Sequence, residues 1–383
     1  MALHFTSEEY DSRMARLHAE MKERELDAML LFSQESMYWL TGFDTFGFVF
    51  FQCLVVTNTG RISLVTRSAD LRQARHTSII EEILVWADRD GADPTRTLKD
   101  HLFELDLLGA TIGIETDTHG LTAKNGKALE DQLRSFATLK EASDLVPALR
   151  AVKSPAEVAM TREAARLGDA AWRAGVGAAG PGVDEGLILA AMHHAIFAGG
   201  GDYPGNEFII GSGRDALLCR YKAGRRALDQ NDQLTLEFAG VWRHYHAAMM
   251  ETVIVGEPRP RHLELFEAAR AALEAVVAAM RPGNTFGQVF DAHAQELNDR
   301  GMQAHRLNAC GYSLGATFSP SWMDKPMFYH GNTAPVVPNM VLFAHMILMD
   351  SESGTAMTLG RSYLTTEADA EPLSTIAPAL VRR

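Results

Sequence analysis

Cysteine is scarce in this chain, with three among 383 residues. Cys53, Cys219 and Cys310 stand far apart, and the sequence contains no CxxC pair. Disulfide frameworks and structural zinc sites draw on more cysteines at closer spacing, so neither is expected here. The three thiols are interpreted as small buried side chains in a protein from a reducing compartment.

Long apolar runs are also missing, since no stretch reaches the roughly 18 residues that a membrane span requires. The chain begins with an amphipathic, charged segment, MALHFTSEEYDSRMARLHAEMKER. A signal peptide would instead show an apolar core followed by small residues. We therefore expect no membrane span and no signal peptide, and a cytoplasmic location.

Positive charge is the third shortage, because 36 basic residues face 49 acidic ones and the formal net charge is −13. Nucleic acid and anionic lipid surfaces repel a chain of this charge. We therefore expect neither as a partner. A small anionic substrate held by a local arginine remains compatible with the composition.

What is present indicates two domains, because the length exceeds that of one ordinary hydrophobic core. Residues 28–133 alternate short apolar strands with helical segments, which is typical of an α/β domain. The composition otherwise matches soluble globular proteins, with 46% hydrophobic and 22% charged residues.

A strong helix start marks the expected domain boundary. Ser154 can cap a helix, Pro155 suits the first helical position, and Glu157 closes a capping box with Ser154. The predicted domains are therefore residues 1–150 and 151–383.

The second domain shows the same order of elements twice, helices followed by strands. The first half ends in strands within residues 232–255, and the second in strands within residues 341–366. No close sequence repeat accompanies this order. Two equivalent halves are expected to bring four strands around one central cavity.

The stretch DQLTLEFAGVWRHYHAAMMETVIVGEP, residues 232–258, is the most informative in the chain. Its first run alternates apolar and polar residues and includes Glu237, and Ala239-Gly240 is expected to break the strand. A second run carries His244 and His246. If the runs pair, Glu237 and one or both histidines face one cavity, where a buried carboxylate can act as a base or nucleophile. Otherwise Glu237 faces solvent and the histidines are ordinary sheet residues.

Five stretches together resemble a known family. They are FTSEEYDSRMARL, YWLTGFDTFGFVFFQCLVV, VKSPAEVAMTREAARLGD, NDQLTLEFAG and GYSLG. Over nearly the whole chain they resemble the creatinase and aminopeptidase P group. The resemblance implies an α/β N-terminal domain and an α+β "pita-bread" C-terminal domain with halves related by a pseudo-twofold axis. It also implies a homodimer in which each N-terminal domain covers the partner's site, so that Phe46 acts in trans.

The resemblance departs from the peptidases of this group at the metal ligands. Those enzymes hold two metal ions with two aspartates, one histidine and two glutamates. By spacing, the positions fall here on Glu237, Ala248, Tyr312, His345 and Leu359. Only Glu237 and His345 are taken as able to bind a metal, so we expect neither metal nor metallopeptidase chemistry. No other cofactor is expected.

Metal-free members of the group offer a closer likeness. Creatinase cleaves a C–N bond in a guanidino compound, and ectoine hydrolases open a small cyclic amidine. Creatinase's catalytic histidine falls here on Arg220, and its two active-site glutamates fall on Met250 and His345. LEFAGVWRHYHAAM and GYSLGATFSPSWMD resemble the ectoine hydrolase-like branch more closely.

Four residues are predicted to be catalytic. Glu237 attacks directly or activates water, and His246 protonates the departing nitrogen, with His244 as the alternative donor or as a rim residue binding substrate. Tyr312 donates a hydrogen bond to the tetrahedral oxygen. His345 is included because its family position favours the cavity. The alternative for each is an ordinary structural residue.

A second group of residues is predicted to bind substrate. Arg220 and Tyr221 are expected to hold a carboxylate, because guanidinium binds that group through two hydrogen bonds. The alternative for Arg220 is a salt bridge with a neighbouring aspartate. Phe46 and Trp322, with Phe318, are expected to form an apolar or cation-binding wall.

The resulting hypothesis is a metal-independent hydrolase acting on a non-peptide C–N bond. Its substrate is a small, nitrogen-rich compound with a carboxylate, similar to ectoine or creatine. One alternative is an Xaa-Pro-type peptidase or a lyase on the same scaffold. Another is a non-catalytic protein that binds a small molecule.

Overall fold

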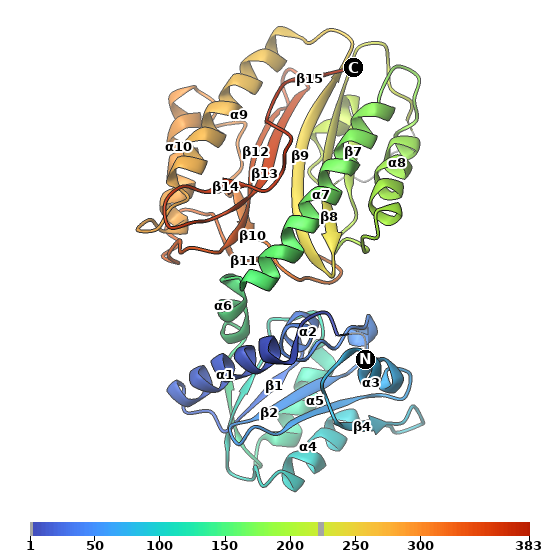
Figure 1. Cartoon of the computed structure of the whole chain (residues 1–383), viewed down its shortest axis with the longest axis vertical. Coiled ribbons are helices and arrows are strands. Elements are labelled where there is room, and N and C mark those ends of the chain that lie inside the picture. The colour runs from blue at the N-terminus through green and yellow to red at the C-terminus, as the bar shows by residue number, and fades with distance from the viewer. Residues whose placement is uncertain (1–2, 221–225) are drawn as a thin grey trace. The chain divides into compact units, whose positions relative to one another are not determined.

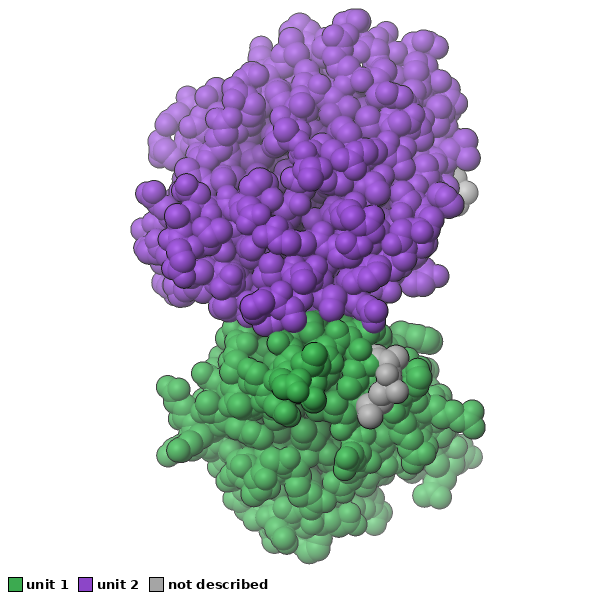
Figure 2. Space-filling model, in the orientation of Figure 1, with its two compact units in different colours: residues 1–150 green, residues 151–383 purple. Residues whose placement is uncertain are grey.

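The computed structural model describes residues 3–220 and 226–383. The chain divides into two compact units, Met1–Arg150 and Ala151–Arg383, which Figure 2 shows in different colours. No helix within the described ranges is long and apolar enough to cross a membrane.

The first unit is built on a mixed six-stranded sheet of order β4-β3-β2-β1-β5-β6 (Figure 1). The strands are β1 (Ala28–Leu31), β2 (Cys53–Thr57), β3 (Ile62–Arg67), β4 (Glu82–Trp86), β5 (Thr111–Ile114) and β6 (Thr138–Glu141). The helices are α1 (Ser7–Glu23), α2 (Gln34–Thr41), α3 (Leu71–Thr77), α4 (Pro94–Glu104), α5 (Ala123–Leu133) and α6 (Leu145–Ala151), with a short 3₁₀ helix η1 (Gly47–Val49).

Helices cover both faces of this sheet. Met29 and Leu31 of β1 pack in one core with residues of α1 and α2. Ala28 and Leu30 of the same strand pack in a second core with residues of α4 and α5. Successive side chains of a strand point to opposite faces, so a strand buried on both sides is apolar throughout. The predicted α/β domain is confirmed.

The second unit opens with the helix that the Ser154 motif predicted. In α7 (Pro155–Ala178) the Ser154 hydroxyl accepts from the Glu157 amide, and the Glu157 carboxylate accepts from the Ser154 amide. The other helices are α8 (Glu185–Ala198), α9 (Pro260–Ala279) and α10 (Phe286–Asp299), with the 3₁₀ helix η2 (Gly213–Leu217). The strands are β7 (Ile209–Ser212), β8 (Asp232–Trp242), β9 (Tyr245–Val255), β10 (Gly311–Ser313), β11 (Asp324–Met327), β12 (Val341–Asp350), β13 (Thr355–Leu364), β14 (Glu371–Pro372) and β15 (Val381–Arg382).

The sheet order shows the two predicted halves directly. It runs β11-β10-β12-β13-β9-β8-β7, so the hairpin β8–β9 is matched by the hairpin β12–β13 across the middle of the sheet. Helix α7 packs against β8 and β9, as α9 packs against β12 and β13 (Figure 1). The α+β fold with pseudo-twofold halves is therefore confirmed.

One local prediction was wrong. Ala239-Gly240 does not break the strand, because β8 continues to Trp242 and pairs with β9 throughout. The turn instead lies at Arg243-His244, whose φ angles are 52° and 64°. Gly240 is needed for close packing, since a Cβ there would overlap the carbonyl oxygen of Ala164 in α7.

Candidate active site around Glu237

The sheet register brings residues from four strands into one row. Glu237 of β8 lies opposite Met250 of β9, Met250 lies opposite Gly360 of β13, and Gly360 lies opposite His345 of β12. Directly opposed residues share a face of a sheet. Glu237 and His345 therefore lie on one face, although 108 positions separate them in the sequence.

Two more of the predicted residues lie on this face. Tyr312 is opposite Phe343, which stands two residues before His345. His246 is opposite Val241, which lies four residues after Glu237 in β8 and therefore points to the same face. The structure thus brings Glu237, His246, Tyr312 and His345 to the same side of the sheet.

Direct contacts join three of the buried residues. The Tyr312 hydroxyl lies 3.5 Å from Glu237 Oε1 and donates to it. The Trp322 indole N–H donates to the Tyr312 hydroxyl oxygen at 2.8 Å. We call Glu237, Tyr312, Trp322 and His345 the Glu237 cluster; the exposed fractions of these residues are 9%, 3%, 1% and 8%.

Burial governs the charge state of Glu237. Loss of water raises its pKa to about 7, although the positive charge of Arg220 and the hydrogen bond from Tyr312 both lower it. At neutral pH both protonation states are therefore populated. Such a carboxyl group can accept a proton and return it within one reaction cycle.

His246 has both ring nitrogens engaged. The Gly205 amide donates to Nε2 at 2.8 Å, so Nε2 carries no proton. The proton therefore lies on Nδ1, which is 3.1 Å from the Thr317 hydroxyl. Burial, with a further contribution from His244, lowers the pKa of His246 to about 3. The His246 ring is therefore neutral and links the loop of Gly205 to the loop of Thr317. Because both ring nitrogens are engaged in this way, these contacts do not fit the predicted role of His246 as proton donor.

His345 is also buried, but its ring is less constrained. Burial lowers its pKa to about 4. Within residues 3–220 and 226–383, its Nδ1 has no hydrogen-bond partner. Its ring lies 5.6 Å from the Tyr312 ring and 5.4 Å from that of Phe343.

The predicted substrate-binding residues are placed differently from one another. Arg220 is exposed, and its charge acts on Glu237, Tyr312 and His345. Trp322 is buried with its N–H turned to Tyr312. His244 lies in the β8–β9 turn and stacks on Phe318 at 4.2 Å between ring centroids.

For two of those residues, Tyr221 and Phe46, the predicted role stays a prediction. Tyr221 lies outside the described residues. Phe46 belongs to the first unit, where it is 80% exposed. Its action on a partner's site stays a prediction.

Sequence reasoning missed three residues that contact the predicted catalytic residues. Phe343 was not singled out, although strand alternation from His345 indicates it. Gly205 and Thr317 were also missed; they lie in loops with no sequence signal and bind His246.

The donor set does not fit a two-metal centre. Gly360, and not the predicted Leu359, occupies the position opposite His345; Leu359 lies opposite Met346 and packs in a separate core. Ala248 lies opposite Ala239. In the described part of the chain, no three His, Cys, Asp or Glu residues are grouped to hold a metal ion.

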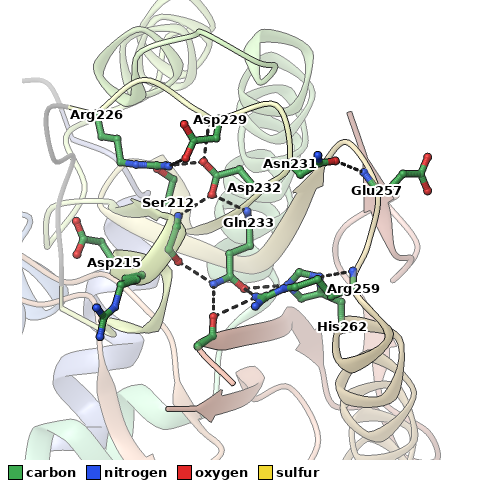
Figure 3. Close-up of a pocket in the computed structure, with 13 residues that line it drawn as sticks. Ser212, Asp215, Arg226, Asp229, Asn231, Asp232, Gln233, Glu257, Arg259 and His262 are labelled. Carbon is green, nitrogen blue, oxygen red and sulfur yellow. Dashed lines mark hydrogen bonds and ion pairs between the residues drawn. The ribbon is translucent and has the colours of Figure 1, made fainter. Parts of the chain in front are cut away.

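A separate pocket of about 520 Å³ lies near the start of β8 and of α9 (Figure 3). Its polar side chains bond to one another: Arg226 pairs with Asp232 at 2.5 Å, and Arg259 donates to the Gln233 amide oxygen at 3.2 Å. Glu237 does not line this pocket. The pairing of its charges gives no indication of chemistry, so the candidate site remains the Glu237 cluster.

Known proteins resemble the chain along its whole length. An uncharacterised hydrolase/peptidase of Sinorhizobium fredii is 27% identical, covering 99% of this chain and 98% of that protein. The ectoine hydrolase of Halomonas elongata is 25% identical, covering 98% and 97%. The solved structure of an Xaa-Pro dipeptidase from Bacillus anthracis shares the fold, with a TM-score of 0.85, 18% identity, and coverage of 98% and 100%.

Family matches agree with these similarities. Residues 13–152 match the creatinase/prolidase N-terminal domain, and residues 159–367 match metallopeptidase family M24. Because the second match spans more than half of the 383 residues, this chain belongs to metallopeptidase family M24.

Proposed function

We propose that this chain is a hydrolase that cleaves a non-peptide C–N bond without a metal ion. The substrate is a small, nitrogen-rich compound that carries a carboxylate, such as a cyclic amidine or amide. The observation that carries the proposal is Glu237, a buried carboxyl group whose pKa is about 7. A carboxyl group in this state suits proton transfer at neutral pH.

Glu237 alone supplies the proton transfers in this proposal. Its carboxylate accepts a proton from water while the water oxygen adds to the carbon of the scissile bond. The bond then breaks, its electron pair goes to nitrogen, and Glu237 returns the proton to that nitrogen. In a variant of this route the Glu237 carboxylate attacks the same carbon directly, the departing nitrogen takes its proton from water, and the hydroxide formed hydrolyses the acyl-Glu237 intermediate to regenerate the carboxylate.

Arg220 is proposed to bind the substrate carboxylate. Its charge acts on Glu237, Tyr312 and His345, which puts a cation beside the reacting group. Guanidinium binds a carboxylate through two parallel hydrogen bonds and so also orients it. A substrate with its carboxylate removed is therefore expected to bind more weakly.

The similarity to an ectoine hydrolase over 98% of the chain supports this substrate class. The donor set supports chemistry without two metals, because Ala248 and Gly360 stand where a two-metal centre needs further ligands. The homodimer, with Phe46 acting in trans, remains part of the proposal. Light scattering after size exclusion tests the dimer.

An Xaa-Pro peptidase is the second candidate, since the family is one of metallopeptidases and the fold is shared with an Xaa-Pro dipeptidase. The same donor set opposes it. Metal content and peptide hydrolysis together separate the two candidates.

The test is incubation of the purified chain with ectoine, creatine and an Xaa-Pro dipeptide, with products followed by mass spectrometry. Turnover of a non-peptide substrate that Glu237→Gln abolishes supports the proposal. Turnover of the dipeptide alone refutes it. Binding that raises the melting temperature without turnover of any compound favours a non-catalytic protein.

A further inference from the structure

We propose that Trp322 is a positioning residue, which orients the Tyr312 hydroxyl so that its proton points at the Glu237 carboxylate. The inference rests on the proposed reacting role of Glu237, and it assigns Trp322 and Tyr312 roles different from those expected of them. Trp322 acts through Tyr312 and not as a wall against substrate. Tyr312 stabilises the charged form of the Glu237 carboxylate through a hydrogen bond and does not bind the tetrahedral oxygen.

The two hydrogen bonds at the Tyr312 hydroxyl run in one direction, from Trp322 to Tyr312 and from Tyr312 to Glu237. An indole N–H can only donate, so Trp322 occupies one acceptor position of the Tyr312 oxygen at 2.8 Å. The tyrosine has one proton, which cannot point back toward the indole. The partner that the geometry offers this proton is Glu237 Oε1 at 3.5 Å.

The hydrogen bond from Trp322 also strengthens the one that Tyr312 donates to Glu237. A hydroxyl that accepts a hydrogen bond becomes a better donor, because successive bonds polarise one another in a low-dielectric interior. Trp322 and Tyr312 are 1% and 3% exposed, so both bonds lie in such an interior. The indole therefore strengthens the interaction between Tyr312 and the ionised form of Glu237.

Trp322 is itself held in place by the loop that carries Gly205 and Asn206. Its backbone amide donates to Asn206 Oδ1 at 3.1 Å. Gly205, next to Asn206, packs closely on Ser321, since a Cβ on that glycine would lie 2.8 Å from the Ser321 carbonyl oxygen. The Gly205 amide is bound to His246. The buried neutral histidine thus secures the loop that supports Trp322.

The other groups that act on Glu237 are few and identifiable. From the segment before β8, the charge of Arg220 lowers the pKa of Glu237. Burial raises the pKa of the neighbouring Cys219 thiol, and the charge of Glu237 raises it further. From β7 and β9, the residues directly opposite are apolar, Ile209 and Met250. Tyr312 is thus the described side chain that donates a hydrogen bond to this carboxylate.

The experiment is a ¹³C NMR titration of the carboxyl carbons in chains labelled with [5-¹³C]glutamate. The Glu237 signal is assigned by its loss in Glu237→Gln, and no substrate is needed. In the unmodified chain its midpoint is expected at about pH 7. Tyr312→Phe is expected to raise the midpoint by about one pH unit, and Trp322→Phe by about half a unit, because each weakens stabilisation of the charged form.

The double variant provides the test of action through Tyr312. Tyr312→Phe/Trp322→Phe is expected to shift the midpoint no further than Tyr312→Phe does, since the indole has no hydroxyl left to act on. The matched control is Trp172→Phe. It removes an indole donor to another buried carboxylate, Glu251, at 3.0 Å, and should leave the Glu237 midpoint unchanged.

A second measurement uses the unmodified chain and so does not depend on folding of the variants. The indole ¹H–¹⁵N signal of Trp322 should move with the Glu237 midpoint, whereas that of Trp172 should not. The inference is overturned if Trp322→Phe leaves the midpoint in place, if the two single shifts add, or if the Trp322 signal ignores the titration. A normal titration with no hydrolysis of any substrate would count against the proposed function only.

Discussion

His345 lies directly opposite Gly360 in the β12–β13 ladder, and Gly360 lies opposite Met250 in the next ladder. The row that begins at Glu237 therefore crosses four strands with one carboxylate and one imidazole. A Cβ on Gly360 would lie 2.9 Å from the Phe343 ring, so aromatic carbon occupies the space beside this position. The local packing leaves no room for a further ligand there.

The first prediction concerns metal content. Because two ions a few ångströms apart need more donors than this row supplies, the purified chain should contain well under one equivalent of manganese, zinc, cobalt or iron. Chelator treatment should leave the melting temperature and any turnover unchanged. Elemental analysis after dialysis provides the measurement. Two equivalents of one metal, or activity restored by metal after chelation, would contradict it.

The second prediction concerns the approach of α7 to β8. Gly240→Ala places a methyl group against the Ala164 carbonyl and the Gly168 backbone, which should cost about 3 kcal/mol or more of unfolding free energy. Gly177→Ala, on α7 itself, is the control, because a Cβ there meets nothing within 4 Å. That variant should gain about 0.5 kcal/mol. Urea unfolding compares the two, and similar stabilities would show that the close approach is absent.

The third prediction concerns the His246 ring. Gly205 donates to Nε2 of His246, and burial lowers the pKa of His246 to about 3. The ring should therefore stay neutral, with its proton on Nδ1. In ¹⁵N NMR of histidine-labelled chain, its two nitrogen shifts should remain constant from pH 5 to pH 8. His246→Ala assigns the signals. A titration within that range would restore His246 as a proton donor.

The fourth prediction follows from the raised pKa of Glu237, about 7 against an ordinary value of 4.5. Between these pH values the unfolded chain has released the proton that the folded chain keeps, so stability falls as pH rises. The difference of 2.5 units corresponds to about 3 kcal/mol. Glu237→Gln removes this term.

The variant should therefore match the unmodified chain near pH 4.5 and exceed its unfolding free energy by up to about 3 kcal/mol at pH 8. Urea unfolding at both pH values gives the comparison. Glu251→Gln serves as a control, because Glu251 pairs with Arg361 at 2.7 Å and its loss should destabilise the chain. Glu237→Gln that destabilises at pH 8 would contradict the burial argument.

Much of the fold could be predicted because its signals are local. The capping box at Ser154 begins α7 as predicted, and strand alternation correctly placed His246, Ala248 and Met250 on one face of β9. The repeated order of helices and strands predicted the two halves of the sheet. The first two patterns each lie within a short stretch of sequence, and the third is the order in which such stretches follow one another.

The failures arose where a residue's role depends on a distant partner. Gly240 resembled a strand break because the helix that packs on it is more than sixty residues earlier in the chain. Leu359 was chosen by spacing, whereas the register of β12–β13 puts Gly360 in the row. The loop contacts of His246 and Trp322 have no sequence signal, so their roles required the structure.

The activity of Glu237→Gln is the most direct measurement. With a non-peptide substrate identified among ectoine, creatine and related compounds, the variant should lose at least about a thousandfold in kcat, because no other proposed group accepts the proton from water. The kcat/KM of the unmodified chain should rise with pH around 7, where Glu237 ionises. Glu237→Gln that keeps full activity, with the same pH profile, would show that the reaction does not depend on this carboxylate.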